Sequence, residues 1–239
     1  MKAFTYTIWV HIKLSMRSKE MLVHFYIVPL VFYLFIGGVF TSINPIAYQT
    51  LIQTMTIFAV SMGGILGSPY ANIEFYGSDI KRAYQVGTIP IWIVALGNFI
   101  STTVNLFFVS MIILLSAPII FDAQTPSNIL SYLLSLMLII VSSVGIGTVL
   151  GLCFKSTSKM GMVSQLIFLP SLMLSGIMFE SSLLPTVLSS IGKILPATWA
   201  FKAMTASELD VVANIVLLLI IVIMFCLSAA RIMQLGKQE

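Results

Sequence analysis

The sequence contains very little charge. Only 8% of its 239 residues are Asp, Glu, Lys or Arg, whereas 59% are hydrophobic. Soluble globular domains carry about 25% charged residues, so this chain cannot build an ordinary water-exposed surface. The composition excludes a soluble fold and predicts one integral membrane domain over residues 1–239.

Motifs for catalysis and metal binding are also missing. No phosphate-binding loop of the form Gly-x-x-x-x-Gly-Lys-Ser/Thr occurs, and the nearest fragment, 154–157, lacks the glycines. The two histidines lack metal-ligand spacing, and Cys153 and Cys226 lie in apolar runs. We therefore expect no metal, no cofactor and no ATPase activity in this chain.

Acidic residues are absent from the interior of the hydrophobic runs. All eight Asp and Glu residues fall at the end of a run or in a loop. Acids inside membrane spans mark proton and ion pathways. Their positions here disfavour a proton-coupled transporter, and Glu180, at the end of the fifth run, is the nearest candidate for such a role.

Six hydrophobic runs are long enough to cross a bilayer. About 20 apolar residues span the hydrocarbon core as a helix, and the backbone inside lipid must satisfy its polar groups within the segment. The sequence therefore predicts an all-α membrane protein with six transmembrane helices. They cover residues 22–40, 51–71, 91–119, 129–153, 161–180 and 211–231.

The distribution of Lys and Arg predicts the orientation of these helices. If the N-terminus lies inside, ten of the 12 basic residues are cytoplasmic, and two, Lys193 and Lys202, are outside. Cytoplasmic loops of membrane proteins are enriched in Lys and Arg. We therefore expect both termini in the cytoplasm.

Residues 1–20 show a rough amphipathic pattern. Trp9 belongs to its apolar face, and Lys13 and Arg17 belong to its polar face. This pattern is typical of an interfacial helix on the cytoplasmic leaflet; a frayed basic terminus is the alternative.

Residues 181–196 keep a helical period but are too short to span the bilayer. Pro185 and Pro196 bracket the segment. The pattern predicts a re-entrant or interfacial helix on the outer face, between spans five and six, and an ordinary seventh span is the alternative.

Weakly polar side chains occur inside the spans and are candidates for a translocation path, although hydrogen bonds between helices would explain most of them equally well. The candidate path residues are the polar Gln53, Thr56, Gln165, Ser171 and Ser175, together with the apolar Phe179. The motifs Gly63-x-x-x-Gly67 and Gly147-x-x-x-Gly151 predict close helix packing, within or between subunits.

Two segments resemble the permeases of type 2 ABC exporters. Residues 77–91 are similar to the family's cytoplasmic stretch, in which a short charged helix precedes a threonine, a proline and the next span. Residues 174–200 resemble its fifth span, outer hairpin and proline-aromatic run. One departure is that the family's acidic-basic-acidic-glycine run is replaced by Phe75-Tyr76-Gly77-Ser78.

The resemblance implies a complex in a bacterial cytoplasmic membrane. A second permease, the same or a relative, and two separate ABC ATPase subunits would be the partners, and the ATPases would bind ATP and Mg. The residues implied to couple to the ATPase are Gly77, Ser78, Asp79, Ile80, Lys81, Arg82, Ala83 and Tyr84. Spans two and five would line the route, with an outer gate at Glu180, Pro185, Pro196 and Trp199.

The predicted path is nearly uncharged and rich in Phe, Met and Leu, which favours an apolar or amphipathic substrate. Within the resemblance this suggests export of hydrophobic peptides, such as bacteriocins or phenol-soluble modulins, by alternating access. The alternatives are a drug, lipid or polysaccharide exporter, a stand-alone channel or secondary transporter, and a scaffold or immunity protein.

Overall fold

The computed structural model describes residues 22–43, 48–77, 92–178 and 184–237, which form helices and the segments that connect them. The prediction of an all-α protein is confirmed for this part of the chain. The elements are η1 (Val23–Ile27), α3 (Val28–Ile43), α4 (Leu51–Ser61), η3 (Met62–Gly67), α5 (Ser68–Gly77), α7 (Trp92–Phe121), α8 (Ile129–Cys153), α9 (Thr157–Met173), α10 (Thr186–Gly192), α11 (Pro196–Thr205) and α12 (Val211–Lys237).

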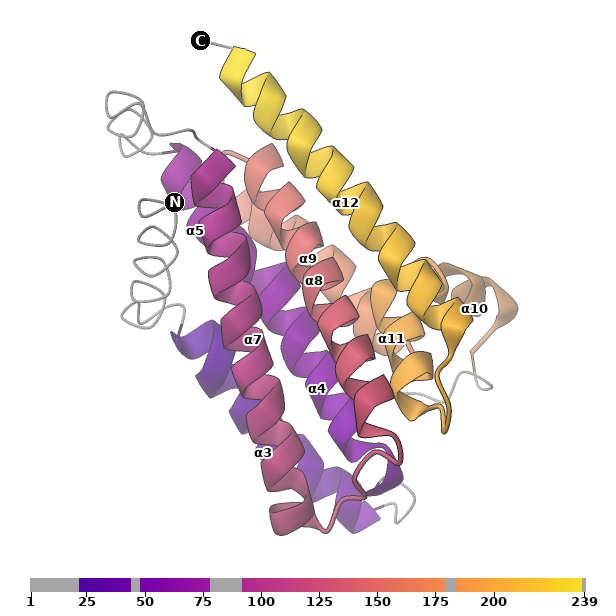
Figure 1. The fold of residues 1–239 in the computed structure, drawn as a ribbon. Coiled ribbons are helices and arrows are strands. Elements are labelled where there is room, and N and C mark those ends of the chain that lie inside the picture. Colours follow the sequence, from indigo (N-terminus) through magenta and orange to yellow (C-terminus); the bar gives the residue numbers. More distant parts are fainter. Residues whose placement is uncertain (1–21, 44–47, 78–91, 179–183, 238–239) are drawn as a thin grey trace.

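The long helices lie side by side in one bundle (Figure 1). The ends of α5, α8 and α12 and the start of α7 gather at the upper end of that view, and α10 and α11 lie to one side. Elements α4, η3 and α5 form one continuous helix, called helix two below, which is the most deeply buried of the long helices.

Among the described residues, four helices are long and apolar enough to cross a membrane, and they lie at Leu51–Glu74, Trp92–Phe121, Ile129–Cys153 and Val211–Leu235. A shorter apolar helix covers Val23–Val39. The predicted bounds of the fourth span, 129–153, are those of α8. The count of six spans stays a prediction.

The fifth predicted span, 161–180, differs from the structure. Helix α9 begins at Thr157 and ends at Met173, and residues 174–178 are not helical. Gly176, three residues beyond the end of α9, has a φ of 88°, a conformation that residues with a Cβ rarely adopt and that does not belong to an α-helix. Hydrophobicity persists past this glycine, so composition alone placed the end of the helix too late.

The segment predicted as a single helix over 181–196 is followed by a second helix that the sequence analysis missed. Pro185 precedes α10, and Pro196 is the first residue of α11, where its missing N–H has no helical partner to lose. The hydroxyl of Thr198 donates to the Gly192 carbonyl at 2.6 Å, and the Trp199 indole donates to the Lys193 carbonyl at 2.7 Å. These bonds fix the start of α11 against the end of α10.

Asp210 sets the start of α12. Its carboxylate accepts a hydrogen bond from the backbone N–H of Ala213 at 2.9 Å and lies 3.4 Å from the Lys202 ammonium. That backbone donor, and then Lys202, hold the pKa of Asp210 below its ordinary value of 3.8. Because the folded pKa is lowered, this cap stabilises the fold above pH 3.8, and its contribution is lost as the pH falls through the folded pKa.

Helix two and α8 approach so closely that their glycines cannot be replaced without a clash. A Cβ on Gly147 would overlap the Gly64 carbonyl oxygen and the Ser68 hydroxyl. A Cβ on Gly151 would lie 2.8 Å from the Pro69 carbonyl oxygen. The second glycine motif therefore packs within the chain.

The first glycine motif packs against the N-terminal helix. A Cβ on Gly63 would lie 2.9 Å from the Phe25 ring, and one on Gly67 would lie 3.0 Å from it. Both glycines belong to η3, which has wide π-type turns, and Phe25 belongs to η1, which has the same geometry. The two wide-turned segments thus meet face to face.

We predict that Gly147→Ala destabilises the protein, whereas Gly161→Ala does not. Alanine favours a helix interior over glycine by up to about 1 kcal/mol, but overpacking costs about 1–3 kcal/mol. At Gly161 a Cβ would meet only the Tyr70 hydroxyl, at 3.4 Å. Thermal unfolding of the two variants in detergent measures the difference, and equal stability would contradict the tight contact described for Gly147.

Candidate functional site

Two buried polar side chains of helix two, Thr56 and Asn72, bind neighbouring helices. The Thr56 and Tyr132 hydroxyls lie 2.9 Å apart, which joins α4 to α8. The amide of Asn98 on α7 donates to the Asn72 side-chain oxygen at 3.2 Å and to the Ser68 carbonyl at 3.3 Å. These bonds satisfy polar groups inside the bundle, where an unpaired group is costly.

The candidate path residues do not gather at one place in the chain. Thr56 is fully buried and bonded to Tyr132. The Ser171 and Ser175 hydroxyls are buried and donate to carbonyls of nearby residues in their own segment.

The other two candidates that the structure describes lie elsewhere. Gln53 lines a polar pocket near the start of α4, and Gln165 is exposed on α9. Phe179 lies outside the described residues.

The outer-gate candidates are partly described. Pro185 and Pro196 start α10 and α11, and Trp199 lies on α11 with the Lys202 ammonium 5.7 Å from its ring centre. Glu180 lies outside the described residues.

The segments expected to meet the ATPase lie almost wholly outside the described residues. Trp9, Lys13 and Arg17 of the expected interfacial helix do so, as do the coupling residues 78–84. Gly77 is the last residue of α5, so the coupling segment follows directly from helix two.

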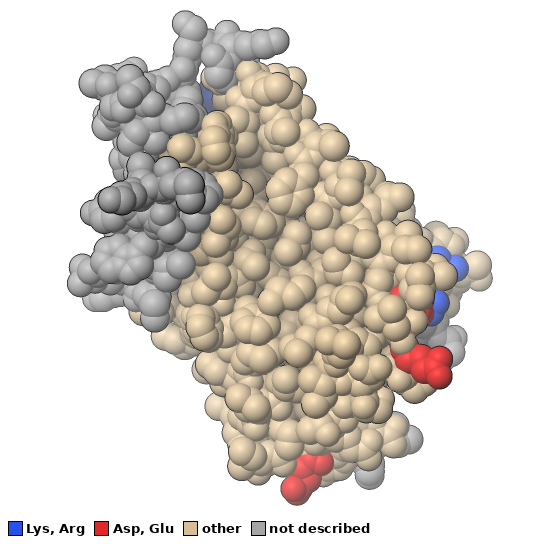
Figure 2. Space-filling model, viewed as in Figure 1, with Lys and Arg blue, Asp and Glu red and all other residues tan. Residues whose placement is uncertain are grey.

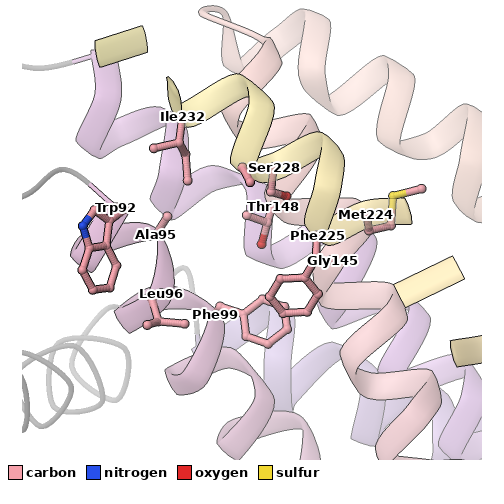
Figure 3. A pocket seen from close by; sticks show the side chains of 11 residues that line it. Trp92, Ala95, Leu96, Phe99, Gly145, Thr148, Met224, Phe225, Ser228 and Ile232 are labelled. Carbon is pink, nitrogen blue, oxygen red and sulfur yellow. The ribbon is translucent and has the colours of Figure 1, made fainter. Parts of the chain in front are cut away.

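An apolar pocket of about 170 Å³ opens between α7, α8 and α12 (Figure 3). Its lining residues are Trp92, Ala95, Leu96, Phe99, Gly145, Thr148, Met224, Phe225, Ser228, Ala229 and Ile232. In Figure 3 Phe99 and Phe225 close one end and Ile232 lies at the other, with Trp92 at the side. The Phe99 and Phe225 ring centres are 5.4 Å apart.

The pocket exists because small residues face one another where three helices meet. A Cβ on Gly145 would lie 3.1 Å from the Met224 Cβ, so α8 and α12 approach each other closely at the base of the pocket. The short side chains of Ala95, Thr148 and Ala229 leave the space of the pocket unfilled. The sequence analysis missed this site, although small residues on α7, α8 and α12 at helical spacing were a usable signal.

The residues that the structure describes contain no group of three or more His, Cys, Asp or Glu side chains that could hold a metal ion. Cys153 and Cys226 are free and exposed.

This architecture is that of a multi-pass helical membrane protein. Comparison with protein-family models matches residues 2–209 to the ABC-2 type transporter family, and the chain belongs to that family. It is the membrane permease component of such a transporter, a subunit without an ATPase domain, and no cofactor is expected in it. Permeases of this family generally act with ATP-binding subunits.

The family match confirms the resemblance to type 2 ABC permeases at the level of the family. Comparisons with curated proteins and with solved structures find no match.

We predict that the hydrogen bond between Thr56 and Tyr132 stabilises the packing of α4 against α8. Thr56→Val and Tyr132→Phe should each lower the free energy of unfolding by about 1 kcal/mol, because each leaves a buried hydroxyl unpaired. The double variant should cost less than the sum of the two. A double-mutant cycle from chemical unfolding in detergent measures this coupling, and strictly additive effects would contradict a direct bond.

Proposed function

We propose that this permease moves a hydrophobic or amphipathic substrate, specifically a peptide, out of a bacterial cell by alternating access. ATP hydrolysis by two separate ABC ATPase subunits would supply the energy. The observation that carries the proposal is the family match over residues 2–209, together with the uncharged interior of the described helices.

We place six spans in the membrane by adding α3 and α9 to the four long helices. Lys155 follows α8, and Arg231 and Lys237 belong to the end of α12, so these basic residues share the upper end of Figure 1. The bias of Lys and Arg toward the cytoplasm supports assigning this end, and both termini, to the inside. Residues 1–20 would then lie on the inner leaflet, and α10 would cover the outer end.

A second permease copy would pack on α9. The outer face of this helix is apolar, with Leu166 73% exposed, but exposed Gln165 lies within it. The exposed apolar side chains around Gln165 are Met162, Leu166, Leu169 and Met173. Because an amide facing lipid lacks hydrogen-bond partners, a partner helix bearing its own polar groups is the better neighbour.

The coupling segment would act on helix two. Gly77 ends α5, and α5 is tied to α7 through Asn72 and Asn98. A force applied by the ATPase to residues 77–84 would therefore reach the buried centre of the bundle rather than its periphery.

The surface and the apolar pocket support an apolar cargo. On the face shown in Figure 2, charged side chains lie only near the edges. The pocket between α7, α8 and α12 is lined by aromatic and aliphatic side chains and opens toward the surroundings of the bundle. An amphipathic peptide, a lipophilic drug and a lipid share the chemistry that such a pocket accepts, so the panel of cargoes tested must include all three.

Cross-linking tests the proposed dimer. In a variant with Cys153→Ser and Cys226→Ser, Leu169→Cys should give a covalent permease dimer with a short bifunctional thiol reagent in membranes. Leu219→Cys is the matched control, since Leu219 is 57% exposed on α12. Dimer formation by the control alone, or by neither variant, would reject α9 as the interface.

ATPase stimulation tests the cargo. The permease, purified with a candidate ABC ATPase subunit, should hydrolyse ATP faster when amphipathic peptides are added. Ala229→Trp, which fills the apolar pocket, should reduce this stimulation several-fold, whereas Val222→Trp on the exposed side of α12 should not. Indifference to every peptide, with stimulation by drugs or lipids, would replace peptide by that class.

A further inference from the structure

A second pocket, polar and about 140 Å³ in volume, lies at the end of the bundle opposite the end of α5. It is enclosed by the start of α4, the connection between α7 and α8, and the end of α11. Four side-chain amides line it, from Gln49, Gln53, Gln124 and Asn128. The remaining lining residues lie at 125–127 and 204–206.

Gln53 lines this pocket, and its side-chain oxygen is buried without a partner. The residue is only 5% exposed, and its Oε1 atom has no hydrogen-bond partner. Burial of a polar atom without a partner is unfavourable. A rotation of the amide that uncovers this oxygen would let a ligand donate a hydrogen bond to it and remove that cost.

Asn128 supplies the complementary group. Its Oδ1 atom accepts a 3.0 Å bond from the Ser131 backbone N–H and so caps α8. The amide NH₂ of Asn128 is then the part left to donate to a ligand. A hydroxyl group both donates and accepts, so one hydroxylated molecule can bind both Gln53 and Asn128.

The lining selects against charge. It contains no Asp, Glu, Lys, Arg or His side chain, so nothing in it would neutralise an ion. Lys202, on α11, is paired with Asp210. The chemistry of the pocket fits a neutral ligand.

The volume limits the ligand to a single ring. An engineered cavity of about 150 Å³ binds one benzene molecule, so this pocket holds about one six-membered ring, and the substituents of that ring would project through its open side. An extended peptide, which rises about 3.3 Å per residue, would need a longer groove.

We propose that this polar pocket binds a neutral, hydroxyl-rich six-membered ring, such as one sugar residue, through the Gln53 side-chain oxygen. The site is separate from the apolar pocket between α7, α8 and α12. It does not depend on the proposed peptide cargo or on the orientation in the membrane.

A set of sugars of similar size but different charge tests the ligand class. The full chain, purified in a detergent without sugar groups, is titrated with glucose, glucosamine and glucuronate while its thermal unfolding is followed. Saturable stabilisation by glucose, with weaker effects of the cationic and anionic analogues, is the expected result. A capped dipeptide amide is included because it also donates and accepts hydrogen bonds.

Gln53→Met tests the assigned oxygen. Methionine has a similar length but no amide, so it should raise the thermal stability of the ligand-free protein while weakening glucose binding about tenfold or more. Gln165→Met is the matched control and should leave glucose binding unchanged. Ala206→Phe, which fills the pocket without altering Gln53, should also abolish binding.

Three results would overturn the proposal. They are no saturable binding of glucose, binding of the dipeptide amide without binding of glucose, and undiminished glucose binding in both Gln53→Met and Ala206→Phe. None of these assays requires an ATPase or a transported cargo. A negative result would therefore reject the sugar site without bearing on the proposed export function.

Discussion

The close contact between helix two and α8 is the constraint on which the rest of the structure depends. Inside lipid, helices gain little from the hydrophobic effect on association, and close packing and hydrogen bonds must hold them together. Gly147 and Gly151 allow the backbone of α8 to touch that of helix two at Gly64 and Pro69. Polar side chains of helix two then reach neighbours on both sides, through the Thr56–Tyr132 and Asn72–Asn98 bonds.

This packed pair places the sites at its margins. The apolar pocket lies where α8 faces α7 and α12, and the polar pocket lies where helix two begins. Most of α12 is exposed, in contrast to helix two, which is the most deeply buried long helix. A rigid centre with exposed outer helices suits a subunit that binds lipid and partner proteins around its circumference.

Sequence analysis predicted what composition encodes, and it failed where local geometry decides. The bounds of α8 were predicted because its apolar run begins and ends where the helix does, and the structure shows that Asn128 caps its start. The end of α9 was misplaced because apolar residues continue beyond Met173, where the helix ends, and past Gly176, whose backbone is not helical.

Helix α11 escaped prediction for a different reason. It is ten residues long, and its buried face consists largely of alanines, so a hydropathy pattern read at the length of a membrane span does not show it. Gln53 and Thr56 were both proposed for the path because both interrupt an apolar run. Sequence could not tell that one is bonded to Tyr132 and the other is left without a partner.

The wide turns of η3 explain why the faces of helix two could not be assigned by counting residues. A π-type turn adds a residue to the helix, and one residue corresponds to about 100° of rotation at 3.6 residues per turn. The face that carries Gln53 is therefore out of register with the face that carries Asn72. Because η3 lies between them in one continuous helix, and is held by Phe25 of the equally wide-turned η1, a movement that starts at Gly77 and travels along helix two reaches Gln53 only through η3.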